Sequence, residues 1–160
     1  VNDLTTDADS VSFCMSKGLS APVGSVICGN NDFIRKARRI RKALGGGMRQ
    51  AGVLAAAGLQ ALDEMLPQLK TDHQNARILA DGISQINGLY IDPKKVSTNI
   101  VFFDLATEIM TAPELVKMVE KEGIRFLALG PKRLRMVTHY GISEDDIRIT
   151  LQAIAHTLNM

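Results

Sequence analysis

The chain has 160 residues, 46% of them hydrophobic, and its net charge is +2 at pH 7. This length suffices for one domain, or one domain and a small part, with an ample apolar core. Seven methionines against only seven aromatic side chains (five Phe, two Tyr) favour a helix-rich α/β interior over a β-sandwich. No apolar run is long enough to cross a membrane and no signal peptide is recognisable, so we expect a soluble cytoplasmic protein.

The first predicted strand leads into a lysine. Apolar residues alternate with small or polar ones from Val11 to Met15, the period of a β-strand, and the alternation stops at Lys17. A second apolar run, residues 25–28, follows after a break at Pro22. An amine held between apolar strands is easier to deprotonate and can form a Schiff base with a carbonyl. The pattern alone equally allows a strand that ends on a solvated lysine.

Two cysteines, Cys14 and Cys28, lie on these two predicted strands. We expect them to be buried thiols of a reducing compartment. Their spacing fits no metal-ligand motif and gives little support to a disulfide, so no metal site is predicted.

A strongly basic helix is predicted next, ending at about Leu44. Asn31 or Asp32 can cap its start, and apolar residues recur at spacings of three and four from Phe33. Residues 30–49 hold seven basic side chains and one acidic one, a net charge of +6, whereas the rest of the chain carries −4. A solvated helix face is the default interpretation. Nucleic-acid binding is a minority alternative, because no aromatic platforms or binding motif accompany the charges.

Three consecutive glycines, Gly45 to Gly47, separate this helix from the next. Such a triplet ends a helix and lets backbone amides approach a ligand, although a plain turn explains it equally well. A long helix is expected from about Met48 to Leu66, almost uncharged until Asp63. A helix this apolar should be buried, either between domains or against another subunit.

Pro67 marks a restart, and the pattern beyond it predicts a small α+β domain. A more polar helix is expected from about Gln68 to Ile86, with Gly88 near its C-terminal cap. The remaining expected strands cover residues 89–91, 99–103, 124–127 and 134–138, and the remaining helices cover 115–122 and a segment with Ile147, Leu151, Ile154 and Leu158 on one face.

Two capping boxes mark the starts of these last two helices. Thr111 is followed three residues later by Glu114, and Ser143 is followed at the same spacing by Asp146.

Two arginines stand near the end of the chain, on the expected strand at 134–138. Strand alternation places Arg133 and Arg135 on one face, and Leu134 and Met136 on the other. Arginine offers a carboxylate a planar, bidentate donor pair and keeps its charge at working pH. The pattern alone favours two exposed arginines on an edge strand.

Three stretches together resemble one enzyme family. They are Ser-Lys-Gly-Leu-Ser-Ala-Pro-Val-Gly (Ser16 to Gly24), Leu-Gly-Gly-Gly-Met-Arg-Gln-Ala-Gly (Leu44 to Gly52) and Arg-Met-Val-Thr-His (Arg135 to His139). In this order and at this spacing they resemble the low-specificity L-threonine aldolases, which are fold type I enzymes that use pyridoxal 5'-phosphate. The likeness extends over essentially the whole chain.

The resemblance implies an α/β fold in which residues 1–66 end the large cofactor-binding domain and residues 67–160 form a small C-terminal α+β domain. It implies cleavage of L-threonine, L-allo-threonine and related β-hydroxy-α-amino acids to glycine and an aldehyde. Lys17 would hold pyridoxal phosphate as a Schiff base, and Arg135 would bind the substrate carboxylate.

The resemblance also implies supporting residues and an oligomer. Ser16 would hydrogen-bond near the lysine or the cofactor phosphate. Arg49 and Lys42 match positions that the family uses near the cofactor from the neighbouring subunit, so a homo-oligomer, dimer or tetramer, is expected.

Enzymes of this family are more than twice as long as this chain. Their phosphate-binding loop, the aspartate that pairs with the pyridine nitrogen and the histidine that stacks on the ring would all precede residue 1. We therefore expect the C-terminal part of an enzyme, inactive without its N-terminal part. Two alternatives stay open: a sister chemistry such as β-elimination, and an inactive remnant that only folds or associates.

Overall fold

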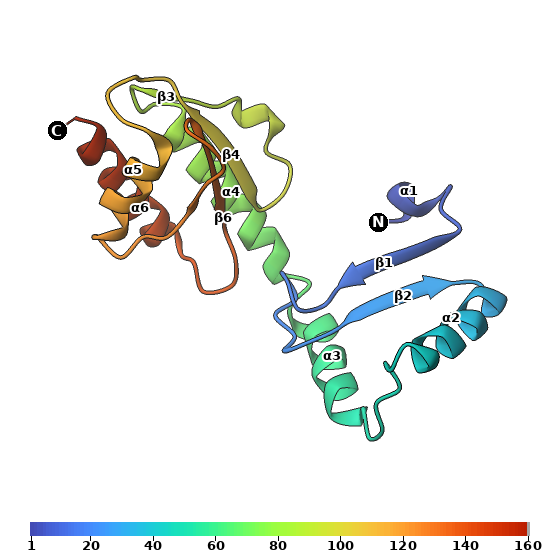
Figure 1. Cartoon of the computed structure of the whole chain (residues 1–160). Helices are drawn as coiled ribbons and strands as arrows, with labels where there is room; N and C mark the ends of the chain where they lie inside the picture. The colour runs from blue at the N-terminus through green and yellow to red at the C-terminus, as the bar shows by residue number, and fades with distance from the viewer. Residues whose placement is uncertain (160) are drawn as a thin grey trace. The chain divides into compact units, whose positions relative to one another are not determined.

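The computed structural model describes residues 1–159, and the chain divides into two compact units, Val1–Leu66 and Pro67–Met160. The first unit combines a two-stranded antiparallel sheet with helices (Figure 1). Its elements are α1 (Asn2–Thr5), β1 (Ser10–Cys14), β2 (Ser25–Gly29), α2 (Asn31–Ala43) and α3 (Gly52–Glu64). The two strands pair over their full lengths, with Phe13 opposite Val26.

The expected burial of the two cysteines is wrong. Cys14 and Cys28 are both exposed free thiols. Cys14 lies opposite Ser25 in the sheet, and its Sγ is 3.4 Å from the Ser25 Oγ. The alternation half-buries Val11 and Phe13 and turns Cys14 to the other, open face of the two-stranded sheet.

The cap of α2 lies one residue before the predicted Asn31 and two before the predicted Asp32. Asn30 is the cap: its Oδ1 accepts a hydrogen bond from the Phe33 backbone N–H at 2.9 Å. None of the residues of α2 is fully buried, and Ile40 on its apolar stripe is 59% exposed. The basic faces are exposed as well, which agrees with a solvated helix.

The helix α3 begins four residues later than predicted, because Gln50 adopts a positive φ of 48° that a helix cannot contain. Its expected burial is confirmed only along one narrow stripe. Gly58 and Ala61 are buried, whereas Val53 and Leu59 are 70% and 63% exposed.

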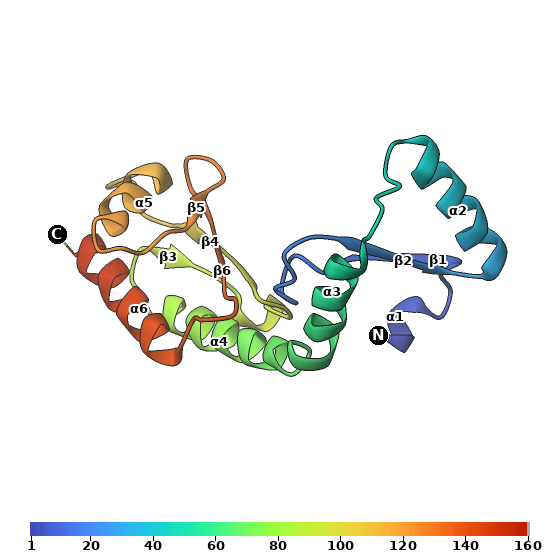
Figure 2. The same ribbon diagram turned by 90° about the horizontal axis from the view of Figure 1, so that it is seen from below.

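The second unit is a four-stranded antiparallel sheet covered by helices (Figure 2). The strand order is β3-β4-β6-β5, so β6 is an inner strand although it comes last in sequence. The elements are α4 (Gln68–Ile83), β3 (Leu89–Tyr90), a 3₁₀ turn η1 (Pro93–Lys95), β4 (Ile100–Leu105), α5 (Ala112–Glu120), β5 (Leu127–Ala128), β6 (Arg133–Val137) and α6 (Glu144–Leu158).

The core of this unit lies between one face of the sheet and the helices. Alternate residues of β4 and β6, among them Phe103 and Leu134, are buried together with Leu79 of α4, Leu115 of α5 and Ile154 of α6. The predicted apolar face of the last helix is confirmed, since Ile147 and Ile154 are buried and Leu151 and Leu158 pack against the same core.

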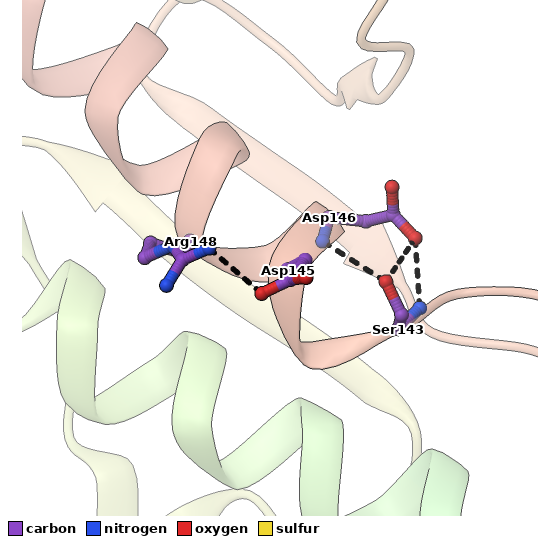
Figure 3. Close-up of polar contacts among 4 residues, drawn as sticks. All are labelled: Ser143, Asp145, Asp146 and Arg148. Carbon is purple, nitrogen blue, oxygen red and sulfur yellow. Dashed lines mark hydrogen bonds and ion pairs between the residues drawn. The ribbon is translucent and has the colours of Figure 1, made fainter.

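Both predicted capping boxes are present. At the start of α6 the Asp146 N–H donates to Ser143 Oγ at 3.2 Å, and Asp146 Oδ2 accepts from the Ser143 N–H at 2.8 Å (Figure 3). The Ser143 hydroxyl and its backbone N–H hold the pKa of Asp146 below its ordinary value. At the start of α5 the Thr111 backbone N–H and hydroxyl lower the pKa of Glu114 in the same way.

Two of the predicted elements in this unit differ clearly from the structure. The strand expected at 124–127 is reduced to two residues of β5, Leu127–Ala128. The helix α4 ends at Ile83, so Gly88, with φ +89°, shapes the turn before β3 instead of capping the helix.

Within residues 1–159, none of the helices combines the length and apolar character that a membrane span requires.

Candidate functional site

Lys17 lies in the loop that joins β1 to β2. It is exposed, and its carbonyl oxygen accepts a hydrogen bond from the Ser20 backbone N–H at 2.8 Å, which closes a four-residue turn. Ser20 completes the turn with a φ of +56°. Ser16, the neighbour of Lys17, is also exposed. The amine therefore projects from a turn of defined geometry, although it is not enclosed by the two strands.

The base of this loop is fixed by Met15. Its N–H donates to the Gly24 carbonyl and its carbonyl accepts from the Ala21 N–H, both at 3.0 Å. Its side chain is buried against α3, where a Cβ built on Gly58 would lie only 3.0 Å from Met15 Cε. Lys17 is thus two residues from an anchored, buried position.

Lys42 and Arg49 flank the glycine-rich loop between α2 and α3. The Lys42 side chain folds over Gly47, because a Cβ built there would lie 3.0 Å from Lys42 Nζ. Glycine at this position therefore leaves room for the ammonium group beside the backbone. Arg49 is exposed just before α3.

The two loops meet α3 at different places. Met15 contacts Gly58 in the middle of the helix, whereas Arg49 precedes its first residue. Ser16 and Lys17 are therefore neighbours in the first loop, whereas Lys42 and Arg49 stand at the two ends of the second.

Arg135 is in the middle of β6, between Phe102 of β4 and Leu127 of β5. Its Nε is buried and has no hydrogen-bond partner within the described part of the chain. A buried donor without an acceptor costs free energy, so this N–H is a place where a ligand acceptor would be stabilised. A carboxylate can accept from the Nε and Nη groups of one guanidinium together.

Arg133, on the same face of β6, is differently placed. Its Nη1 lies 3.8 Å from Asp104 Oδ2, and its guanidinium carbon is 5.5 Å from the centre of the Phe102 ring. The predicted alternation is confirmed, since Leu134 and Met136 are buried on the opposite face. The structure thus separates two arginines that the strand pattern could not, and it leaves Arg135 with the unused donor.

Thr138, just after β6, is a structurally important residue that sequence reasoning missed. It is 2% exposed, and its Oγ1 donates to the Asp72 carbonyl oxygen at 2.6 Å. Its N–H donates to the Asn99 carbonyl at 3.0 Å, and its own carbonyl accepts from Asn99 Nδ2 at 2.7 Å. Its place inside the Arg-Met-Val-Thr-His stretch was the available signal.

The other titratable groups near β6 form no metal centre. His139 is exposed, with its Nδ1 2.8 Å from the Tyr140 carbonyl oxygen. Over residues 1–159, clusters of three or more His, Cys, Asp or Glu side chains that could hold a metal ion are absent.

The chain resembles a protein family, curated protein sequences and solved structures. The family model described as beta-eliminating lyase matches residues 1–107. Low-specificity L-threonine aldolase 1 of Arabidopsis thaliana is 45% identical over 159 residues, which cover 99% of this chain and 44% of that protein. The low specificity L-threonine aldolase of Escherichia coli strain K12 is 36% identical over 147 residues, covering 92% of this chain and 42% of that protein.

Among solved structures, serine palmitoyltransferase of Sphingomonas wittichii matches with a TM-score of 0.76 at 18% identity. That match covers 98% of this chain and 41% of the other. The predicted fold class is confirmed: the chain has the α/β fold of the C-terminal part of fold type I enzymes.

The chain spans less than half the length of the two aldolases, 44% and 42%. The family model covers 107 of its 160 residues, including the loop that carries Lys17 and the loop between Lys42 and Arg49. The chain belongs to the beta-eliminating lyase family.

Proposed function

We propose that this chain carries the cofactor lysine and the carboxylate-binding arginine of an aldolase that uses pyridoxal phosphate. The enzyme cleaves L-threonine, L-allo-threonine and related β-hydroxy-α-amino acids to glycine and an aldehyde. The observation that carries the proposal is the 45% identity to a low-specificity L-threonine aldolase, in an alignment of 159 residues that spans both Lys17 and Arg135.

The residues present fit this cofactor. Lys17 offers an exposed primary amine on a loop held at its base by Met15. Lys42 and Arg49 offer cationic groups beside a glycine-rich backbone, the chemistry that a phosphate group requires. When bound, pyridoxal phosphate supplies an electron-accepting ring that stabilises negative charge at the substrate α-carbon.

Each of these side chains has a separate task. Lys17 Nζ is the atom that would hold the cofactor, and the turn from Lys17 to Ser20 fixes the backbone from which the lysine side chain extends. Ser16 offers a hydroxyl beside it. Arg135 binds the substrate carboxylate through its Nε and Nη groups, which orients the α-carbon and brings the reacting bonds into position.

Lys42 and Arg49 act across a subunit interface in this proposal. Within one chain, Lys42 lies over Gly47 and Arg49 lies just before the first residue of α3, whereas the Lys17 loop packs on α3 at Gly58. A second copy can supply them to the Lys17 loop of the first, which makes the enzyme a homo-oligomer. Two exposed free thiols suit a reducing compartment, so we place the enzyme in the cytoplasm.

The test is trapping of the cofactor. The full-length protein that contains this sequence is incubated with pyridoxal phosphate, reduced with borohydride and analysed by peptide mass spectrometry. We expect the tag on Lys17, its loss in Lys17→Ala, and its retention in Lys117→Ala, which removes another exposed lysine. A tag on a different side chain, or none, would refute the proposal.

The reaction products distinguish the chemistry. The aldolase releases acetaldehyde and glycine from L-threonine in equal amounts. The family description favours β-elimination as the second candidate, which would instead release ammonia and 2-oxobutanoate. A tag on Lys17 with neither pair of products would support an inactive remnant.

A further inference from the structure

Thr138 joins three parts of the second unit. Its hydroxyl reaches the backbone of α4 at Asp72, and its peptide group pairs with Asn99, which precedes β4. The residues joined are 66 and 39 positions apart in sequence. All three polar groups of residue 138 are therefore engaged, three positions after Arg135.

The hydrogen bond from the Thr138 hydroxyl holds β6 against the helix layer, a direction in which the backbone pairing of the sheet does not hold it. Backbone pairing holds β6 against β4 and β5 within the plane of the sheet, and the β4 ladder ends at the pair Ile100–Val137. The bond from Thr138 Oγ1 to Asp72 crosses from the sheet to the helix layer. A second hydrogen bond joins α4 to the loop between β6 and α6: Asn75 Nδ2 donates to the Ile142 carbonyl at 2.8 Å.

The environment of Thr138 makes this bond a strict constraint on position. The residue is 2% exposed and the hydroxyl bond is 2.6 Å long, so water has little access to replace the acceptor. A small displacement of β6 along α4 would leave a buried hydroxyl without a partner, which is costly. Arg135 shares this strand, and its Nε is the buried donor that has no acceptor in the described chain.

We propose that Thr138 is a positioning residue for Arg135: its hydroxyl holds β6 against α4 so that the Arg135 guanidinium meets the substrate carboxylate. The inference rests on the proposed function, in which Arg135 binds that carboxylate. Removing the hydroxyl shifts the strand end without changing any group that touches the substrate.

The experiment compares glycine with glycinamide, two amines of which only glycine carries a carboxylate. Their dissociation constants are measured on the full-length protein loaded with pyridoxal phosphate, from the change in cofactor absorbance. The readout is the ratio of the two constants. We expect Arg135→Gln to lower this preference for glycine about 100-fold and Thr138→Val to lower it about tenfold, since misplacement of a binding group weakens it without removing it.

Two further variants separate positioning from stability. Thr138→Ser keeps a hydroxyl and should keep the preference. Thr157→Val is the matched control, because Thr157 is also buried and its hydroxyl donates to the Ala153 carbonyl at 2.9 Å within α6. Thr157→Val should lower the melting temperature about as much as Thr138→Val while leaving the preference unchanged.

The outcomes distinguish this inference from the proposed function. If Thr138→Val binds glycine with the wild-type preference while Arg135→Gln has lost it, Thr138 has only a structural role and the inference is wrong. If Arg135→Gln also keeps the preference, or the wild-type protein does not prefer glycine, then Arg135 does not bind the carboxylate. That result would overturn the proposed role of Arg135.

Discussion

The side chain of Leu151 in α6 lies directly against the backbone of Gly82 in α4. A Cβ built on Gly82 would be 2.7 Å from Leu151 Cδ2 and 3.1 Å from its Cγ. The two helices therefore approach each other at a point where one of them has no side chain, and Leu151 fills the space.

This contact predicts that Gly82→Ala destabilises the second unit. The added methyl group would displace Leu151 from the core, which costs about 1–3 kcal/mol and exceeds the gain of about 1 kcal/mol from better helix propensity. Urea unfolding measures the difference. A stabilised Gly82→Ala variant would show that the helices can separate without cost.

A double-mutant cycle identifies the cause of that destabilisation. Leu151→Ala should largely remove the penalty of Gly82→Ala, because the clashing methyl groups are gone, so the two changes should not be additive. Additive free energies would place the effect elsewhere.

A second glycine supports the Lys17 loop. Gly58→Val should destabilise the first unit by about 1–3 kcal/mol, since its side chain would displace Met15 from α3. Hydrogen exchange should then lose protection at the Met15 amide, which bonds to Gly24. Gly52→Val is the control on the same helix, because no heavy atom lies within 4 Å of a Cβ built there. Equal loss of protection in both variants would contradict the role of the Met15 contact.

The capping box of α6 gives a third prediction. Ser143→Ala removes the acceptor of the Asp146 N–H and should lower the free energy of unfolding by about 1 kcal/mol. Ser143→Asn, which can still cap, should recover most of the loss. Arg148→Ala removes only the exposed pair with Asp145 and should have a much smaller effect (Figure 3).

The same caps predict how stability depends on pH. The pKa values of Glu114 and Asp146 are lowered in the folded chain by the backbone and hydroxyl groups of Thr111 and Ser143. Their contribution is therefore complete above the unfolded pKa of each carboxyl and is lost as the pH falls through the lower folded pKa. Urea unfolding between about pH 5 and pH 2 should show this fall, and Glu114→Gln with Asp146→Asn should flatten it. An equally steep fall in that double variant would assign it to other carboxyl groups.

The two arginines of β6 offer a matched pair of variants. Arg135→Gln should raise the KM for L-threonine about 10–100-fold, because a charged hydrogen-bond donor to the carboxylate is lost. Arg133→Gln should leave KM within about twofold, since that side chain already contacts Asp104 and Phe102. A larger effect at Arg133 would reverse the assignment.

Local signals predicted much of the fold. Both capping boxes, the strand alternation around Leu134 and the apolar face of α6 follow from residues within a few positions of each other, and the structure contains them all. The wrong predictions concern features that contacts between distant parts of the chain, or the backbone of a single residue, determine. The exposure of Cys14 depends on how few strands pair in the first unit, and the late start of α3 depends on the backbone of Gln50.

The candidate site likewise has residues that the sequence could identify and features that only the structure shows. Lys17, Ser16, Lys42, Arg49 and Arg135 were all named from the sequence, and their roles stay predictions. The sequence could not show which arginine of β6 has an unused donor, because that depends on Asp104 and Phe102 of β4. Nor could it show that Thr138 bonds to a helix 66 residues earlier.

The inner position of β6 affects the order in which the second unit can assemble on the ribosome. Until residues 133–137 have been synthesised, β4 has an unpaired edge and β5 has no neighbour. A released chain that ends before this point exposes an apolar strand edge to other chains. The final quarter of the sequence is therefore required to close the sheet, and truncations within it should leave an aggregation-prone chain instead of a smaller stable domain.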